Sequence, residues 1–109
     1  MTSRNPLAGV MLKEAAAISV AAERLDAKTA SKAVDLLVSC GGKVIITGVG
    51  KSGLVAQKIA ASFTSVGLLS VYLNPLDALH GDIGVVRDGD VVVIISNSGN
   101  TSELLAIVR

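Results

Sequence analysis

Aromatic residues and cysteine are scarce in this chain of 109 residues, which holds one Tyr, one Phe, one Cys and no Trp. A surface that stacks nucleobases needs several exposed aromatic side chains, so the composition argues against a nucleic-acid partner. A single cysteine cannot form an internal disulfide, which fits a reducing compartment. Lys and Arg total 10 against 9 Asp and Glu, so no excess of charge draws the chain to nucleic acid or to a membrane surface.

Long apolar runs are also absent, because no run approaches the roughly 18 residues of a membrane-spanning helix. The first residues lack the basic-then-apolar pattern of a signal peptide. We therefore expect a cytoplasmic protein with no membrane partner. Hydrophobic residues make up 50% of the chain, and they occur as short Val/Ile/Leu runs and alanine-rich segments. This composition is typical of a parallel sheet covered by helices on both faces.

Two helices are predicted at the start of the chain. From residue 7 to residue 24, apolar residues recur at alternating steps of four and three, which is typical of one helix stripe. This stripe, which we expect to lie in the core or in a subunit interface, consists of Met11, Ala15, Ile18, Ala22 and Leu25. A second helix is predicted over 26–39, because Gly41 and Gly42 follow it as stop signals. The residues expected to face inward from it are Ala30, Ala33, Val34 and Leu37.

Three apolar runs after these helices predict strands, over 44–47, 68–73 and 91–95. The run over 91–95, VVVII, is expected to be the most strongly buried of the three. The connecting segments are predicted to be a helix over 52–66 that closes at Gly67, an irregular stretch over 75–86 with a short helical turn, and a turn over 87–90.

Strands that alternate with helices at this spacing form βαβ units, which give a parallel sheet with right-handed crossovers. The predicted fold class is therefore α/β, a three-layer α/β/α sandwich in which the strands have the flavodoxin-like order 2-1-3. A last helix is predicted from Thr101 onward. Because three strands are few for a doubly wound sheet, we expect residues 1–109 to be the N-terminal portion of a longer domain.

The first predicted strand leads into the loop GVGKSG, residues 48–53. A P-loop requires a glycine five positions before its Gly-Lys pair, and that position is Ile45, so this interpretation fails. The spacing of Gly48, Gly50 and Gly53 does match the fingerprint of a dinucleotide-binding turn. That fold also needs an acidic side chain at the end of the second strand to bind the ribose. At this place the chain has Tyr72, Leu73 and Asn74.

A third interpretation of this loop is a phosphosugar site, which needs no cofactor. Glycine lets the backbone come close to a ligand, and the free N–H groups at the start of the next helix favour an anion. Ser52 would then bind the phosphate together with these N–H groups, while Lys51 reaches the sugar.

A second polar loop, SNSGNTSE at residues 96–103, follows the third predicted strand. Its hydroxyl groups, gathered at a helix start, provide donors that converge on a tetrahedral oxyanion, a cluster that a nicotinamide site does not need. With the strand order 2-1-3, the loops after the first and third strands meet at the topological switch point, where ligands bind in open α/β sheets. The second loop therefore favours the phosphosugar interpretation.

These loops resemble those of a known family. SNSGNTSE is similar to the SxSGxTxE loop of the sugar isomerase (SIS) domain, and GVGKSG followed by NP and ALHGDIG resembles the arabinose-5-phosphate isomerases of the KpsF and GutQ type. The resemblance is specific because three motifs, at 48–53, 75–84 and 96–103, occur in the right order. The family's fold is a five-stranded parallel α/β/α sandwich, usually tetrameric and often followed by paired CBS domains, of which this sequence contains none.

The resemblance implies an aldose–ketose isomerase that interconverts D-arabinose 5-phosphate and D-ribulose 5-phosphate through an enediol, the entry step to the Kdo sugar of lipopolysaccharide or capsule. It implies catalytic roles for Lys51 and Glu103 and a homo-oligomer whose small-molecule partner is a phosphosugar. His80 would lie beside the sugar, where an inhibitory metal can also bind. The implied substrate-binding residues are Gly48, Gly50, Ser52, His80, Ser96, Asn97, Ser98, Gly99 and Thr101.

Structural explanations for these residues remain open. Asn100 and Glu103 have the spacing of a capping interaction, Lys51 can be a solvated lysine in a first turn, and His80 can be a loop histidine without a ligand. The hydroxyls of the second loop can serve as strand-end and cap groups. Two other functions stay open as well: a non-catalytic phosphosugar-binding or regulatory module, and a nucleotide-binding unit.

Overall fold

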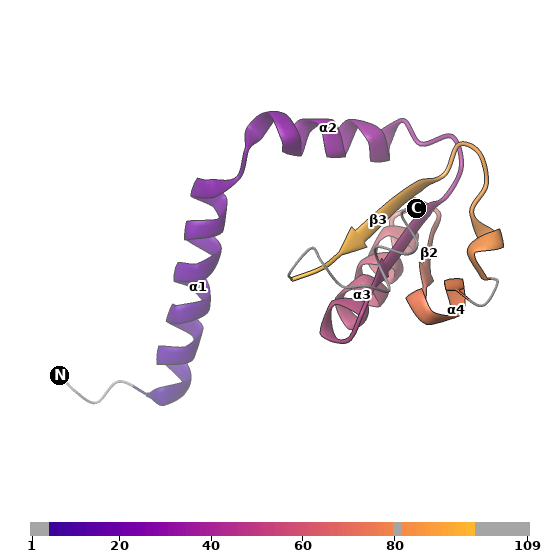
Figure 1. Ribbon diagram of the computed structural model, residues 1–109. Coiled ribbons are helices and arrows are strands. Elements are labelled where there is room, and N and C mark those ends of the chain that lie inside the picture. The colour runs from indigo at the N-terminus through magenta and orange to yellow at the C-terminus, as the bar shows by residue number, and fades with distance from the viewer. Residues whose placement is uncertain (1–4, 80–81, 98–109) are drawn as a thin grey trace. The chain divides into compact units, whose positions relative to one another are not determined.

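The computed structural model describes residues 5–79 and 82–97 (Figure 1). The chain divides into two compact units, one ending at Val34 and the other beginning at Asp35. The elements are, in chain order, α1 (Pro6–Arg24), α2 (Ala27–Val38), β1 (Val44–Gly48), α3 (Lys51–Ser65), β2 (Ser70–Leu73), α4 (Pro75–Leu79), the 3₁₀ helix η1 (Asp82–Val85) and β3 (Val91–Ile95).

The first unit consists of α1 and most of α2. Asn5 caps α1, because its Oδ1 accepts a hydrogen bond from the N–H of Leu7 at 2.8 Å, and Pro6 stands in the first turn, where its missing N–H costs no helical bond. At the start of α2, the carboxylate of Asp26 accepts hydrogen bonds from the hydroxyl and the N–H of Thr29, and both lower the pKa of Asp26. Both helices match their predicted bounds to within one residue.

The apolar stripe of α1 is exposed, since no residue of this helix is buried and Met11 exposes 69% of its surface. In α2, Ala30 and Leu37 are half-buried, whereas Ala33 and Val34 are exposed. The predicted inward face of α2 is therefore correct for two residues and wrong for two. Leu37 packs against the hydrophobic core of the second unit, whereas neither Ala33 nor Val34 is among the described residues that pack against a core.

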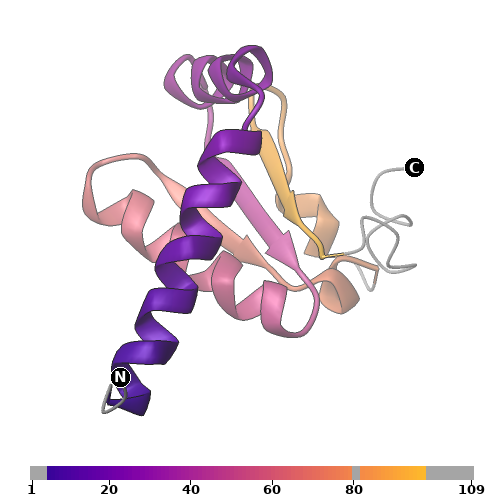
Figure 2. The same cartoon turned by 90° about the vertical axis from the view of Figure 1, so that its left-hand side faces the viewer.

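The second unit is built on a parallel sheet with the strand order β2-β1-β3, as predicted. Val44 at the start of β1 pairs with Ser70 of β2 and with Val91 of β3. The central strand β1 lies between its two neighbours in Figure 2 and is buried along its whole length. Its carboxyl end therefore lies between the carboxyl ends of the other two strands.

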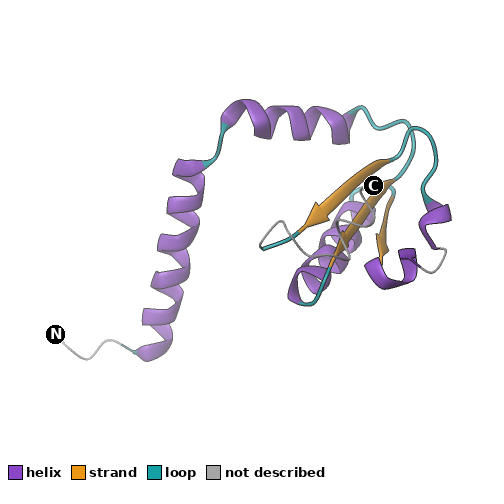
Figure 3. Ribbon diagram, in the orientation of Figure 1, coloured by secondary structure: helices purple, strands orange, loops and turns teal. Residues whose placement is uncertain are grey.

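Side chains of β1 alternate between the two faces of the sheet, and each face has its own core. On one face, Val44 and Ile46 pack against buried alanines of α3, whose small side chains let the helix lie close to the strands. On the other face, Ile45 packs with Leu73 and with Ala78 of α4. Helices thus cover both faces (Figure 3), in agreement with the predicted α/β sandwich.

The prediction that the VVVII strand is the most strongly buried is wrong. Residues of β3 alternate between half-buried and exposed, and Val92 and Ile94 expose 40% and 37% of their surface, whereas β1 is fully buried. Within the described residues β3 pairs with β1 alone, so it is an edge strand. The predicted irregular stretch over 75–86 contains α4 and η1, and the helix predicted from Thr101 lies outside the described residues.

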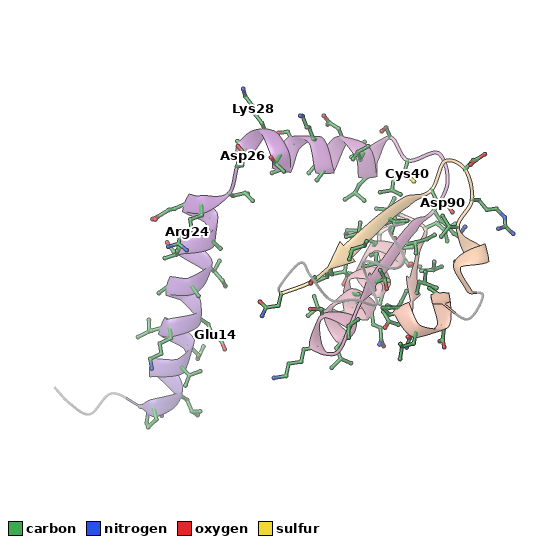
Figure 4. The ribbon with its side chains drawn as sticks, viewed as in Figure 1. Glu14, Arg24, Asp26, Lys28, Cys40 and Asp90 are labelled. Atoms are coloured by element: carbon green, nitrogen blue, oxygen red, sulfur yellow. The ribbon has the colours of Figure 1, made fainter. Side chains whose placement is uncertain are left out.

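An ion pair ties β1 to β3 at the amino ends of these strands. The carboxylate of Asp90 accepts hydrogen bonds from the Nζ of Lys43 at 2.7 Å, the N–H of Lys43 at 2.8 Å and the N–H of Arg87 at 2.8 Å. The bond from the Lys43 side chain is the main reason why the pKa of Asp90 falls to about 2. Figure 4 labels Asp90 at this end of the sheet, opposite the glycine loop.

Candidate functional site

The glycine loop connects β1 to α3 at the carboxyl end of the sheet. The strand ends at Gly48, and Gly50 is the N-cap of α3 with a φ of 62°. This left-handed conformation favours glycine, because a Cβ there would collide with the residue's own backbone. Lys51 and Ser52 follow as the first two residues of the helix. The sequence thus places both side chains in the first turn of α3.

Two other glycines of this loop are required by close packing. A Cβ on Gly48 would lie 2.8 Å from the carbonyl oxygen of Ser52 and 2.9 Å from that of Ile95. A Cβ on Gly53 would lie 2.7 Å from the carbonyl oxygen of Gly48. The spacing that matches a dinucleotide fingerprint therefore has a steric cause within the chain, namely the close approach of α3 to β1 and β3.

The start of α3 offers hydrogen-bond donors to a ligand. No side chain within the described residues caps the helix, and its first N–H groups carry the positive end of the helix dipole. Ser52 is half-buried and Lys51 is exposed. Across residues 5–79 and 82–97, the Lys51 ammonium forms no ion pair. An anion bound at this helix start would meet the dipole, a hydroxyl and a lysine together.

Residues at the end of β3 lie next to this loop. In the sheet register Gly48 pairs with Ile95, and Ser96 and Asn97 follow directly. Ser96 is half-buried and Asn97 is exposed. The structure therefore brings the start of the second polar loop to the glycine loop, as the strand order predicted. The remaining predicted residues, which lie outside the described residues, are His80, Ser98, Gly99, Thr101 and Glu103.

A pocket opens on the other side of the glycine loop, between the ends of β1 and β2. Its volume is about 130 Å³. It is lined by Gly48, Val49, Gly50, Tyr72, Asn74, Pro75 and Leu76. The Oδ1 of Asn74 accepts a hydrogen bond from the N–H of Leu76 at 2.9 Å and so begins α4.

Sequence reasoning missed the part of this pocket that comes from the end of β2. In the sequence, Tyr72 and Asn74 stand where a ribose site would need an acidic residue, and Asn74 is also part of the NP pair that resembles the family. A signal for the pocket is nevertheless present, because the predicted order 2-1-3 already puts the end of the second strand beside the glycine loop.

Within the described residues, no group of three His, Cys, Asp or Glu side chains is placed to hold a metal ion. The suggested inhibitory metal at His80 falls outside that part of the chain. Among the helices that the structure describes, none has both the length and the apolar character needed to cross a membrane.

The sequence pattern of the SIS domain matches residues 36–109 of this chain. The chain belongs to the SIS domain family. This match begins within one residue of Asp35, where the second compact unit begins. The SIS domain thus contains the sheet, the glycine loop and the pocket, and it also contains the second polar loop.

Named relatives of this SIS domain are sugar-phosphate isomerases. The chain is 37% identical over 98 residues, 90% of its length, to the arabinose 5-phosphate isomerase KpsF of Escherichia coli O6:H1. It is 46% identical over 76 residues, 70% of its length, to the arabinose 5-phosphate isomerase KdsD of Salmonella typhi. These matches cover 30% and 23% of the two relatives, so the SIS chain spans less than a third of their length.

Solved structures share the fold of this SIS domain. A Listeria monocytogenes protein assigned to the sugar-phosphate isomerases is 34% identical, with a TM-score of 0.86 over 97% of this chain and 59% of that one. An Escherichia coli CFT073 protein, whose structure is a complex with arabinose 5-phosphate, is 38% identical, with a TM-score of 0.77 over 95% of this chain and 58% of that one.

Proposed function

We propose that the protein is an aldose–ketose isomerase that interconverts D-arabinose 5-phosphate and D-ribulose 5-phosphate. One observation carries this proposal: the glycine loop at the start of α3 and the hydroxyl-bearing end of β3 meet at the carboxyl end of the sheet. The names of the relatives KpsF and KdsD, and the arabinose 5-phosphate in the Escherichia coli CFT073 structure, support the choice of substrate.

The phosphate of the substrate would bind at the start of α3. The helix N–H groups and Ser52 lie there, with Ser96 beside them at the end of β3. Ser98 and Thr101 are assigned to the same phosphate by their place in the SxSGxTxE loop. Such contacts contribute to catalysis by holding the reacting carbons in a fixed position.

The reaction moves a proton between C2 of the aldose and C1 of the ketose. In the proposed mechanism Glu103 removes the C2 proton while O1 gains a proton, which gives the enediol. A proton is then returned at C1 while the O2 hydroxyl loses its proton, which gives the ketose. Lys51, in the first turn of α3, polarises the carbonyl and stabilises the oxyanion that develops on it. The assignment of Glu103 rests on the family motif, and that of Lys51 on the motif together with its place at the loop.

The resemblance of the loops to the arabinose-5-phosphate isomerases also suggests the setting of this activity. A ribulose 5-phosphate to arabinose 5-phosphate conversion would supply the precursor of Kdo for lipopolysaccharide or capsule. We place it in a cytoplasmic homo-oligomer of this chain that uses no cofactor.

The experiment that tests the proposal is an assay for the ketose on the full-length protein, with arabinose 5-phosphate as substrate. We expect ribulose 5-phosphate to form until the two sugars reach equilibrium. Binding of arabinose 5-phosphate without turnover would instead support the non-catalytic phosphosugar-binding module. A companion measurement of Tm with each ligand tests the remaining alternative. A Tm that rises with NAD and not with arabinose 5-phosphate would contradict both the isomerase and the phosphosugar-binding module, and it would support a nucleotide-binding unit.

A further inference from the structure

Thr47 is the one polar side chain in the central strand of the sheet. It follows Val44, Ile45 and Ile46 in β1 and, like them, has no exposed surface. Valine has nearly the same shape and could be buried there without the cost of removing a hydroxyl group from water. Burial alone therefore does not explain why this position carries a hydroxyl.

The hydroxyl of Thr47 joins β1 to β2. It donates a hydrogen bond to the carbonyl oxygen of Leu73. In the sheet register Thr47 pairs with Leu73, and this is the last pair between the two strands. Beyond it the two chains part, because β1 continues through Gly48 into the glycine loop and β2 is followed by Asn74, which begins α4. The side-chain bond thus holds the strands together where their pairing ends.

The next residue, Gly48, connects this bond to the start of α3. A Cβ on Gly48 would lie 2.8 Å from the carbonyl oxygen of Ser52 and 2.9 Å from that of Ile95, so its backbone packs directly against the first turn of α3 and the end of β3. Interiors packed this closely transmit strain from one residue to the next. A shift at Thr47 would therefore move Ser52 and its neighbour Lys51 relative to β3.

A second bond of the same kind lies at the opposite end of β2. The hydroxyl of Thr64, in the last turn of α3, donates to the carbonyl oxygen of Ser70 at 3.1 Å. Ser70 pairs with Val44 at the amino end of the sheet, whereas the glycine loop lies at the carboxyl end. Thr64 therefore provides a comparison in which the chemistry of the bond is the same but its place relative to the site differs.

We propose that Thr47 is a positioning residue. Its hydroxyl bond to β2 fixes the end of β1, and through Gly48 it holds the first turn of α3, with Lys51, in the geometry that the reaction requires. This inference rests on the proposed function, because it concerns the turnover of the phosphosugar. Thr47 is fully buried, so it acts through its neighbours. Its removal lowers the rate because a small misplacement of a reacting group has a large effect on turnover.

Steady-state kinetics on the full-length protein, with arabinose 5-phosphate as substrate, tests this role. Thr47→Val keeps the shape of the side chain and removes the hydroxyl. We expect kcat to fall about tenfold. KM should change less than about twofold, because the phosphate contacts at the helix start remain. Thr47→Ser keeps the hydroxyl and loses a methyl group, so its kcat should stay close to that of the wild type. Thr64→Val should leave kcat unchanged.

The Tm of each variant separates positioning from a general loss of stability. Both Thr47→Val and Thr47→Ser should melt below the wild type, since one removes a buried hydrogen bond and the other leaves a cavity. At a temperature at which every variant is folded, positioning predicts that only the valine variant loses kcat. Thr47→Ala, compared with Thr47→Ser, repeats the removal of the hydroxyl with a smaller side chain and provides the test if Thr47→Val does not fold.

Three results would overturn the inference while leaving the proposed isomerase intact. Equal losses of kcat in Thr47→Val and Thr47→Ser would assign the effect to packing. A wild-type kcat in Thr47→Val would leave the bond with a role in stability alone. A loss in Thr64→Val as large as that in Thr47→Val would show that the place of the bond does not matter. A wild-type protein that forms no ribulose 5-phosphate would instead contradict the proposed function and this inference together.

Discussion

At the scale of single residues, the glycine loop is shaped by contacts that leave no room for a side chain. A Cβ on either Gly48 or Gly53 would lie less than 3 Å from a backbone carbonyl oxygen. Lys51 and Ser52 owe their position to this packing, because α3 can begin where it does only if both glycines are present. The position of the proposed ligand-binding side chains therefore depends on the close packing of these two glycines.

The substitution Gly53→Ala tests this steric role. Its methyl group would lie 2.7 Å from the carbonyl oxygen of Gly48, so we expect a loss of about 1–3 kcal/mol in the free energy of unfolding, measured by urea denaturation. Gly84→Ala is the matched control, because nothing lies within 4 Å of its Cβ position. Equal stabilities of the two variants would contradict the steric account.

Lys51→Ala tests the proposed electrophile. We expect kcat for arabinose 5-phosphate to fall by about 10²- to 10³-fold, because the developing oxyanion loses its stabilising charge. The Kd for inorganic phosphate should rise less than about fivefold, as for an exposed ion pair. Lys58→Ala removes another exposed lysine of α3 and should keep full activity. A parallel loss of turnover and of phosphate binding would instead identify Lys51 as a phosphate-binding residue.

At the scale of elements, the sequence predicted which segments are helices and strands better than how deeply each is buried. The strands β1 and β3 are both apolar runs, yet β1 is buried and β3 is partly exposed. The composition of a segment indicates that it is an apolar strand, whereas its burial depends on which other elements pack beside it. For the same reason α4 could be anticipated only as a short helical turn, because its start depends on the side chain of Asn74.

The candidate site was predictable to a similar degree. The two loops and their meeting at one end of the sheet follow from strand order and motif spacing, and the register of Gly48 with Ile95 confirms that the glycine loop and the start of the second loop are neighbours. Tyr72 belongs to none of the motifs that the sequence analysis used, and Asn74 was read only as part of the NP pair, so their place in the pocket was missed. That place depends on the shape of the loop beside them, which only the folded chain reveals.

The ion pair between Asp90 and Lys43, which joins the starts of β3 and β1, predicts how the stability of the fold depends on pH. The folded pKa of Asp90, about 2, lies below the ordinary 3.8, so the stabilisation from Lys43 is complete above about pH 4 and is lost as the pH falls toward 2. We expect Asp90→Asn to lower Tm at pH 7, and the difference from the wild type to shrink as the pH falls from 4 toward 2. Circular dichroism against temperature measures both.

A control for this prediction lies in the same turn. Asp88→Asn removes a carboxylate that forms no ion pair with Lys43, and its Tm should follow that of the wild type at pH 7. A difference between Asp90→Asn and the wild type that stayed constant with pH would show that the carboxylate of Asp90 does not stabilise the fold through its charge.

At the scale of the whole molecule, the family match and the second compact unit begin at neighbouring residues, 36 and 35. The sheet and the glycine loop belong to that unit, while α1 precedes it in the chain and keeps its apolar stripe exposed. This chain spans less than a third of the length of the KpsF and KdsD relatives, so the isomerase activity is a proposal that the assay has to test.

The most direct test of the proposed isomerase is to run the reaction in D₂O. An enediol mechanism predicts that the full-length protein converts arabinose 5-phosphate to ribulose 5-phosphate that carries deuterium at C1, because the base exchanges its proton with solvent before returning it. Proton NMR detects both the ketose and the label. Absence of any ketose, under conditions in which calorimetry shows that arabinose 5-phosphate is bound, would contradict the isomerase.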